Sequence, residues 1–172
     1  MPQAITHILV PLLLVSFFRD LYIRKKPKKN FSLHYALIAG LAGVLPDIDV
    51  IIPSLQGYTH LFLVPLIFLL LFFLFRTAHI KARICNIGRH NIKLSLIFLM
   101  VSIGTFLHIL LDALVWGPSH VFFPLFNLGL GLGLLEDLSP VYKNNLMSIL
   151  DGSLFMIWLA YLELKHKISD FI

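Results

Sequence analysis

Five long apolar stretches constrain the fold of this chain more than any other feature of its sequence. They cover residues 4–23, 31–52, 59–75, 94–116 and 146–162. Each stretch is about 17–23 residues long, which is the length an α-helix needs to cross a hydrocarbon core of roughly 30 Å. Charged residues make up only 13% of the chain, which leaves too little polar surface to cover a water-soluble globule. We therefore predict an all-α, polytopic membrane bundle of about five transmembrane helices, forming a single domain over residues 1–172.

A sixth apolar segment, residues 121–135, differs from the other five. It is shorter than a membrane span, contains Gly129, Gly131 and Gly133, and follows Pro118. Glycine and proline break regular helices. We expect a Gly-rich interfacial hairpin or re-entrant piece here, and not another crossing.

The basic residues predict an orientation in the membrane. With five spans, the clusters at 24–29, 76–93 and 165–167 all fall on one side, and of the 14 Lys and Arg only Lys143 falls on the other. Cytoplasmic loops carry the excess of Lys and Arg in membrane proteins. We predict a multi-pass protein of the inner (cytoplasmic) membrane with its N-terminus outside and its C-terminus in the cytoplasm. The same pattern argues against a soluble nucleic-acid-binding protein.

Ionisable residues from all five predicted spans fall at one depth. Counted from the basic residue at the opposite end of the same span, they lie about 21–30 Å above the inner face, at a rise of 1.5 Å per residue. These residues are His7, Asp47, Asp49, His60, His108, Asp112 and Asp151. Carboxylates inside a membrane are costly, at roughly 2.5–3.5 kcal/mol each at the centre of a helix. Their common depth therefore predicts a shared ligand.

A divalent metal ion is the simplest shared ligand for this set. It neutralises carboxylates and binds neutral imidazoles, and His108 and Asp112 share one helix face because they are four residues apart. Mixed histidine and carboxylate ligands favour zinc, with iron or manganese as alternatives. The predicted metal ligands are His7, Asp47, Asp49, His60, His108 and Asp112.

Short motifs surround these residues. They are Thr6-His7, Gly43-Val44-Leu45-Pro46-Asp47-Ile48-Asp49, Gly57-Tyr58-Thr59-His60, His108-Ile109-Leu110-Leu111-Asp112 and Phe123-Pro124-Leu125-Phe126. In these motifs the chain resembles a family of LexA-regulated, inner-membrane, metal-dependent hydrolases that are distantly similar to zinc-dependent phospholipase C. The family has His-Arg before the glycine of the third motif, where this chain has Leu55 and Gln56. A metal ligand and a phosphate-binding cation of the family pattern are therefore both replaced.

The resemblance implies a hydrolase that acts on a lipid, or on another amphiphilic ester or phosphodiester, at the outer face of the membrane. A metal-activated water would then be the nucleophile, and Asp49 or Asp151 would be the catalytic general base. The expected partners are membrane lipids, while the oligomeric state is not set by the sequence. Two alternatives stay open: a non-catalytic membrane protein with a structural metal site, and a metal transporter.

Overall fold

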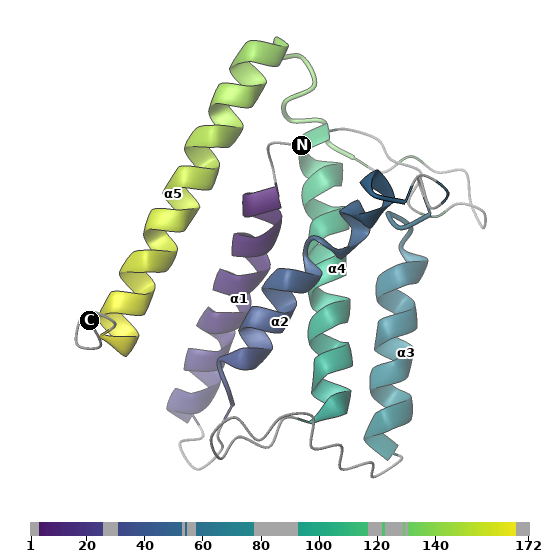
Figure 1. The fold of residues 1–172 in the computed structure, drawn as a ribbon, viewed down its shortest axis with the longest axis vertical. Helices are drawn as coiled ribbons and strands as arrows, with labels where there is room; N and C mark the ends of the chain where they lie inside the picture. Colours follow the sequence, from purple (N-terminus) through teal and green to yellow (C-terminus); the bar gives the residue numbers. More distant parts are fainter. Residues whose placement is uncertain are drawn as a thin grey trace.

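The computed structural model describes residues 4–25, 31–52, 54, 58–77, 93–116, 122, 129 and 131–167. All regular structure in these residues is helical (Figure 1). In chain order the elements are α1 (Ala4–Lys25), α2 (His34–Ala42), the 3-10 helix η1 (Leu45–Val50), α3 (Leu63–Thr77), α4 (Leu94–Trp116) and α5 (Pro140–His166). The prediction of an all-α bundle is confirmed.

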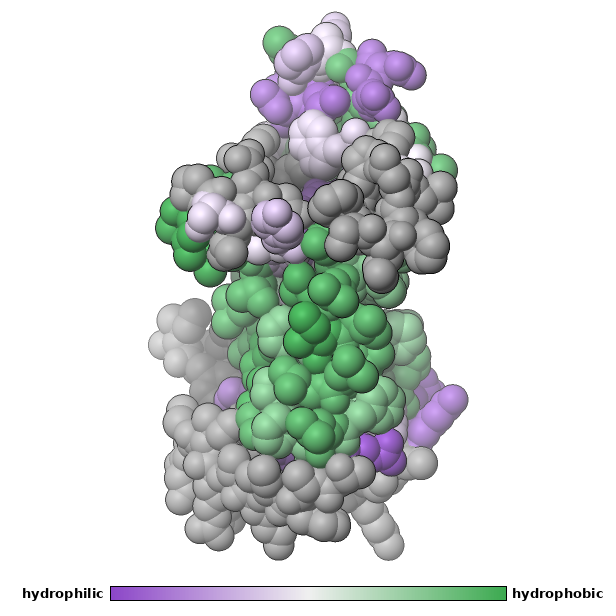
Figure 2. Space-filling model, turned by 90° about the vertical axis from the view of Figure 1, so that its right-hand side faces the viewer, coloured by the Kyte–Doolittle hydropathy of each residue, from purple (hydrophilic) through white to green (hydrophobic). Residues whose placement is uncertain are grey.

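Three of the described helices, α1, α4 and α5, are long and apolar enough to cross a membrane, and α3 is a shorter apolar helix. The face of the molecule over α3 carries an apolar band, with hydrophilic side chains toward both ends (Figure 2). Large apolar side chains of α3, among them Leu70 and Leu74, are exposed on this face. Such a surface is unfavourable in water and suits lipid.

The second apolar stretch differs from the continuous span that its hydropathy predicts. It forms the 9-residue helix α2 and then the 6-residue 3-10 helix η1. Pro46 stands in the first turn of η1, and proline has no N–H to donate and disfavours the α conformation in the residue before it. Together, α2 and η1 still bring the chain back to the end of the bundle where α1 begins (Figure 1).

Helices α1, α2 and α4 pack with very close backbone contacts. A Cβ atom placed on Gly104 of α4 would lie 2.3 Å from the carbonyl oxygen of Ala39 in α2, and one placed on Gly43 would lie 2.0 Å from the carbonyl oxygen of His7 in α1. Small residues at such crossings let membrane helices approach closely. This packing places the C-terminal end of α2 against the backbone of His7 and the side chain of His108.

Helix α5 packs chiefly on α1, and polar contacts join the two helices near both ends of α1. At one end the Thr6 hydroxyl donates a hydrogen bond to the carboxylate of Asp151. At the other end, Asp20 accepts a hydrogen bond of 3.2 Å from the Tyr161 hydroxyl and lies 3.5 Å from Lys165 Nζ. The contact with Thr6 puts Asp151 at the level of His7, as its position in the sequence predicts.

Part of the predicted interfacial segment 121–135 lies outside the described residues, but the structure describes its last five residues, 131–135. The backbone N–H groups of Leu132, Leu134 and Leu135 donate hydrogen bonds of 2.8–3.3 Å to the carbonyl oxygens of residues 113–115 in α4. These carbonyls belong to the last turn of α4, which has no helical partners for them. Residues 131–135 therefore fold back along the end of α4 and satisfy its free carbonyl groups.

Candidate metal centre

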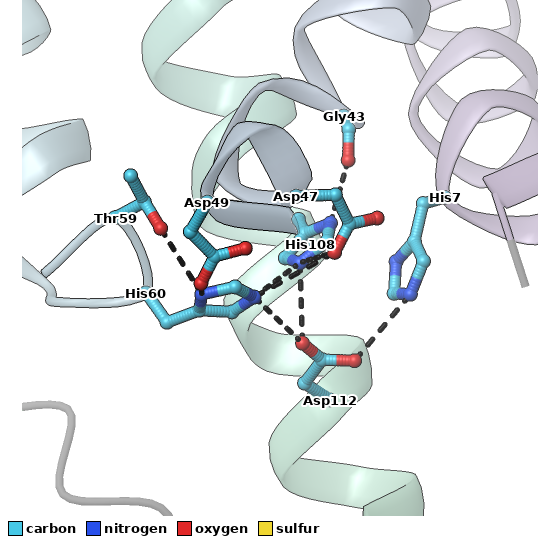
Figure 3. A network of polar contacts seen from close by, with 8 residues as sticks. All are labelled: His7, Gly43, Asp47, Asp49, Thr59, His60, His108 and Asp112. Atoms are coloured by element: carbon cyan, nitrogen blue, oxygen red, sulfur yellow. Dashed lines mark hydrogen bonds and ion pairs between the residues drawn. The ribbon is translucent and has the colours of Figure 1, made fainter. Parts of the chain in front are cut away.

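The six residues predicted as metal ligands come together at the end of the bundle where α1 begins and α4 ends (Figure 3). They come from four segments that are far apart in the chain. These are His7 from α1, Asp47 and Asp49 from η1, His60 from the turn before α3, and His108 and Asp112 from α4. Two groups within this set have the geometry of a possible metal site: His7, His108 and Asp112, and Asp47, His60 and His108.

Four donor atoms lie at the centre of the cluster. His60 Nε2 is 3.2 Å from His108 Nε2. Asp47 Oδ1 lies 3.7 Å from each of these two nitrogens, and Asp112 Oδ2 lies 3.6 Å from His60 Nε2 and 3.1 Å from His108 Nε2. Tetrahedral ligands at zinc bond lengths of about 2.0–2.2 Å are about 3.3–3.6 Å apart. Each of the two triangles of donors, which share the edge between the imidazoles, therefore has about the size expected of three ligands of one small cation.

The imidazole of His108 is held in one tautomer by the backbone. Its side chain is fully buried, and Nδ1 is 2.6 Å from the carbonyl oxygen of Gly43. Because a carbonyl oxygen can only accept, Nδ1 carries the hydrogen and donates it. The lone pair of the neutral ring is then on Nε2, which faces the other donors, and this is the usual arrangement of a metal-binding histidine.

The imidazole of His60 is held in a similar way by a side chain. Its Nδ1 lies 3.4 Å from Asp49 Oδ2, and Thr59 Oγ1 is 3.3 Å from the same nitrogen. A carboxylate at Nδ1 favours a hydrogen there, so the lone pair on Nε2 faces Asp47 and Asp112. In this geometry Asp49 contacts the far side of the ring, and it orients His60 instead of joining the four central donors.

His7 lies at the edge of the cluster and is almost fully buried, with 4% of its surface exposed. Its Nε2 is 3.4 Å from Asp112 Oδ1, and its ring packs on the ring of His108 with centroids 4.0 Å apart. Its Nδ1 is buried without a hydrogen-bond partner among the described residues. Asp112 thus offers one oxygen to His7 and the other to the central donors.

The charge of the cluster also favours a cation. All the ion pairs that the described residues form with Asp47 and Asp112 involve histidines. Neutral imidazoles leave these two carboxylates uncompensated, in surroundings where each side chain is at most 22% exposed. Burying unpaired carboxylates is costly, and a divalent cation between them removes most of that cost.

Asp151, one of the two residues predicted as general base, lies beside the cluster instead of within it. It is buried on α5, and its described hydrogen bond is with Thr6, the neighbour of His7. The replaced positions Leu55 and Gln56 lie outside the described residues. Sequence reasoning did not find the role of the Gly43 carbonyl, although Gly43 belongs to the second motif, and no sequence signal marked Gly104.

The fold and the cluster define a class: an all-helical membrane protein with a buried group of histidines and aspartates able to hold a metal ion. The chain matches the family model described as YdjM inner membrane protein over residues 1–167. It therefore belongs to the YdjM inner membrane protein family, and the resemblance seen in its motifs is confirmed at that level. Neither the curated proteins nor the solved structures gave a match.

Proposed function

We propose that this protein is a membrane-bound, metal-dependent hydrolase that acts on a lipid, or on another amphiphilic ester or phosphodiester. The observation that carries the proposal is the spacing of the four central donors, 3.1–3.7 Å for the pairs that contact one another. Zinc is the metal that this mixture of imidazole and carboxylate ligands suits best, and iron and manganese are the alternatives.

Each residue of the cluster has a role in this proposal. Asp47, His60, His108 and Asp112 hold the metal, and His7 completes the set beside Asp112. A bound divalent cation supplies a Lewis acid and lowers the pKa of water in its coordination sphere toward neutrality. Of the two residues predicted as general base, Asp49 is the nearer to the donors, because it contacts His60 at 3.4 Å and orients its ring, whereas Asp151 contacts Thr6.

The position of the cluster in the bundle suggests which face of the membrane it serves. Arg24, Lys25, Arg76, Lys93 and Lys165 all lie at the ends of helices opposite to the cluster. If that basic end is cytoplasmic, the cluster opens at the outer leaflet of the inner membrane. The core below it contains apolar residues such as Leu9, Leu12 and Met100, which favours a site of chemistry over a path for metal transport.

Metal analysis combined with an activity assay tests this proposal. Protein purified in detergent should hold one divalent ion per chain, and it should hydrolyse phospholipids or chromogenic phosphodiesters. Chelation should remove activity, and zinc should restore it. Protein that binds no divalent metal contradicts the proposal, while full occupancy without hydrolysis of any ester or phosphodiester identifies the metal as structural.

A further inference from the structure

A groove of about 620 Å³ lies between α1 and α4, outside the metal centre. Its walls come from these two helices together with Phe31. Leu14 and Phe18 line it from α1, and Ile103 and Leu107 line it from α4. Phe18 is 63% exposed, so the groove is open toward the surroundings of the bundle.

The lining of the groove selects hydrocarbon over water. Apart from Arg19 and the hydroxyl of Tyr22, the lining side chains carry no N–H or O–H group. A stable buried water needs two to four polar partners, and apolar cavities without them stay dry. Both helices are candidate membrane spans, so the hydrocarbon available at the groove is that of the bilayer.

At the end of the groove away from the metal centre, the guanidinium group of Arg19 already has hydrogen-bond partners. Arg19 Nε donates a hydrogen bond of 2.8 Å to the carbonyl oxygen of Phe31, and its guanidinium lies 3.0 Å from Asp20. Arg19 therefore already has two partners at this end, and it shares Asp20 with Lys165, whose Nζ lies 3.5 Å from that carboxylate. The polar part of an occupant therefore belongs at the other end.

The opposite end of the groove lies toward the metal centre along both helices. Leu107 precedes His108 directly in α4, and α1 carries both the groove residue Leu14 and His7. Along α4 the lining runs from Leu96 to Leu107, about 17 Å at a rise of 1.5 Å per residue. The groove is thus a long apolar channel parallel to the helices, with the donor cluster beyond the end near Leu107.

We infer that the groove binds one acyl chain of a membrane lipid, whose ester or phosphodiester group then lies at the metal centre. The inference rests on the proposed function for the role of the headgroup, but the binding of the chain does not depend on hydrolysis. It names the substrate class: a lipid with a long hydrocarbon chain that enters from the bilayer between α1 and α4.

A matched pair of variants separates the groove from the rest of the lipid-facing surface. Leu14→Trp fills the groove, whereas Leu21→Trp makes the same change on the same helix outside the lining, at nearly equal exposure of 39% and 40%. The probe for binding is a phospholipid with a photoactivatable sixteen-carbon chain, in bilayer nanodiscs. Crosslinks should concentrate on the lining of α1 and α4 and fall at least tenfold in Leu14→Trp but not in Leu21→Trp.

The activity arm uses two phosphodiesters that share a p-nitrophenyl leaving group and carry either a hexadecyl or an ethyl group. Water adds to phosphorus as p-nitrophenolate leaves. Leu14→Trp should lose at least tenfold in kcat/KM for the hexadecyl compound, with the ethyl compound unchanged.

Labelling spread evenly over exposed residues of α3, such as Leu70, overturns the groove as a site, even if both esters are hydrolysed. Concentrated labelling without hydrolysis of either compound sustains the groove and refutes a phosphodiesterase activity of the metal centre.

Discussion

His108 is fully buried in the metal centre. It belongs to both groups of potential ligands, and its Nε2 lies within 3.7 Å of donor atoms from His60, Asp47 and Asp112. Its other nitrogen is bound to the backbone of Gly43. A residue in this position links the two triangles of donors, so its loss should affect the whole centre.

We predict that His108→Ala abolishes metal binding and hydrolysis while the protein still inserts in the membrane. Insertion depends on the apolar spans and their flanking charges, whereas the metal depends on the imidazole. The measurements are metal content by mass spectrometry and membrane fractionation. His34→Ala, at the start of α2 near the basic end, is the control and should keep the metal. Unchanged metal content in His108→Ala would refute the ligand assignment.

Asp47 and Asp49 are expected to differ in their effects, because they contact opposite nitrogens of His60. We predict that Asp49→Asn still binds the ion, with an affinity lowered about 10–100-fold, as is usual for residues that orient a ligand. At saturating zinc its turnover should fall by no more than about 10–100-fold, because a residue that orients a ligand acts on the reaction through His60. Asp47→Asn should lose the ion itself. A greater loss of affinity in Asp49→Asn than in Asp47→Asn would reverse the two roles.

At the scale of the elements, the crossing of α2 with α1 and α4 determines whether the cluster forms. The backbones meet at Gly43 and Gly104, with Ala39 and Ala42 opposite Gly104. This crossing brings the Gly43 carbonyl to His108, and it aligns η1 with the end of α4. A side chain added at the crossing would separate helices that each carry part of the cluster.

We predict that Gly104→Ala destabilises the protein by about 1–3 kcal/mol, the usual cost of overpacking, and lowers metal occupancy. Its Cβ would lie 2.3 Å from the carbonyl oxygen of Ala39, a backbone atom that cannot yield without moving α2. The matched control is Gly152→Ala in α5, where an added Cβ would meet no atom within 4 Å among the described residues beyond its own stretch of helix. It should be neutral or stabilise by roughly 0.5–1 kcal/mol through helix propensity. Thermal unfolding in detergent compares the two, and equal Tm values would contradict the close crossing.

At the scale of the whole molecule, the helices alternate in direction, so that the described basic residues at the helix ends, other than Lys143, lie at the end of the bundle opposite to the cluster. Helices α1, α3 and α5 run from the cluster end to the basic end, and α4 runs back (Figure 1). Helix α2 is too short to be a full span. Together, α2 and η1 lead the chain from the basic end, where α1 ends, back to the cluster end, where α3 begins. This arrangement of charges favours one orientation of the bundle in the membrane, with the basic end in the cytoplasm.

We predict that the N-terminus is outside and the C-terminus is cytoplasmic, because positive charge is retained on the cytoplasmic side. Reporter fusions made after residue 83 and after Lys167 should both report the cytoplasm, and a fusion after Leu135 should report the outside. The fusion after Leu135 is the internal control, since it lies between α4 and α5. An outside signal after Lys167 would reverse the proposed placement of the metal centre.

The hydropathy and charge of the sequence were sufficient to predict the helical class, the approximate limits of α1, α3 and α4, and which ionisable residues share one depth. These properties are set by transfer of side chains between water and lipid, which depends on residue type and spacing alone. His7, Asp47, Asp49, His60, His108 and Asp112 were predicted in this way, and they do come together.

Other features depend on which backbones meet. The Gly43 carbonyl at His108, the contact of Asp151 with Thr6 and the groove between α1 and α4 all arise from contacts between residues distant in the chain, where local hydropathy carries no information about the partner.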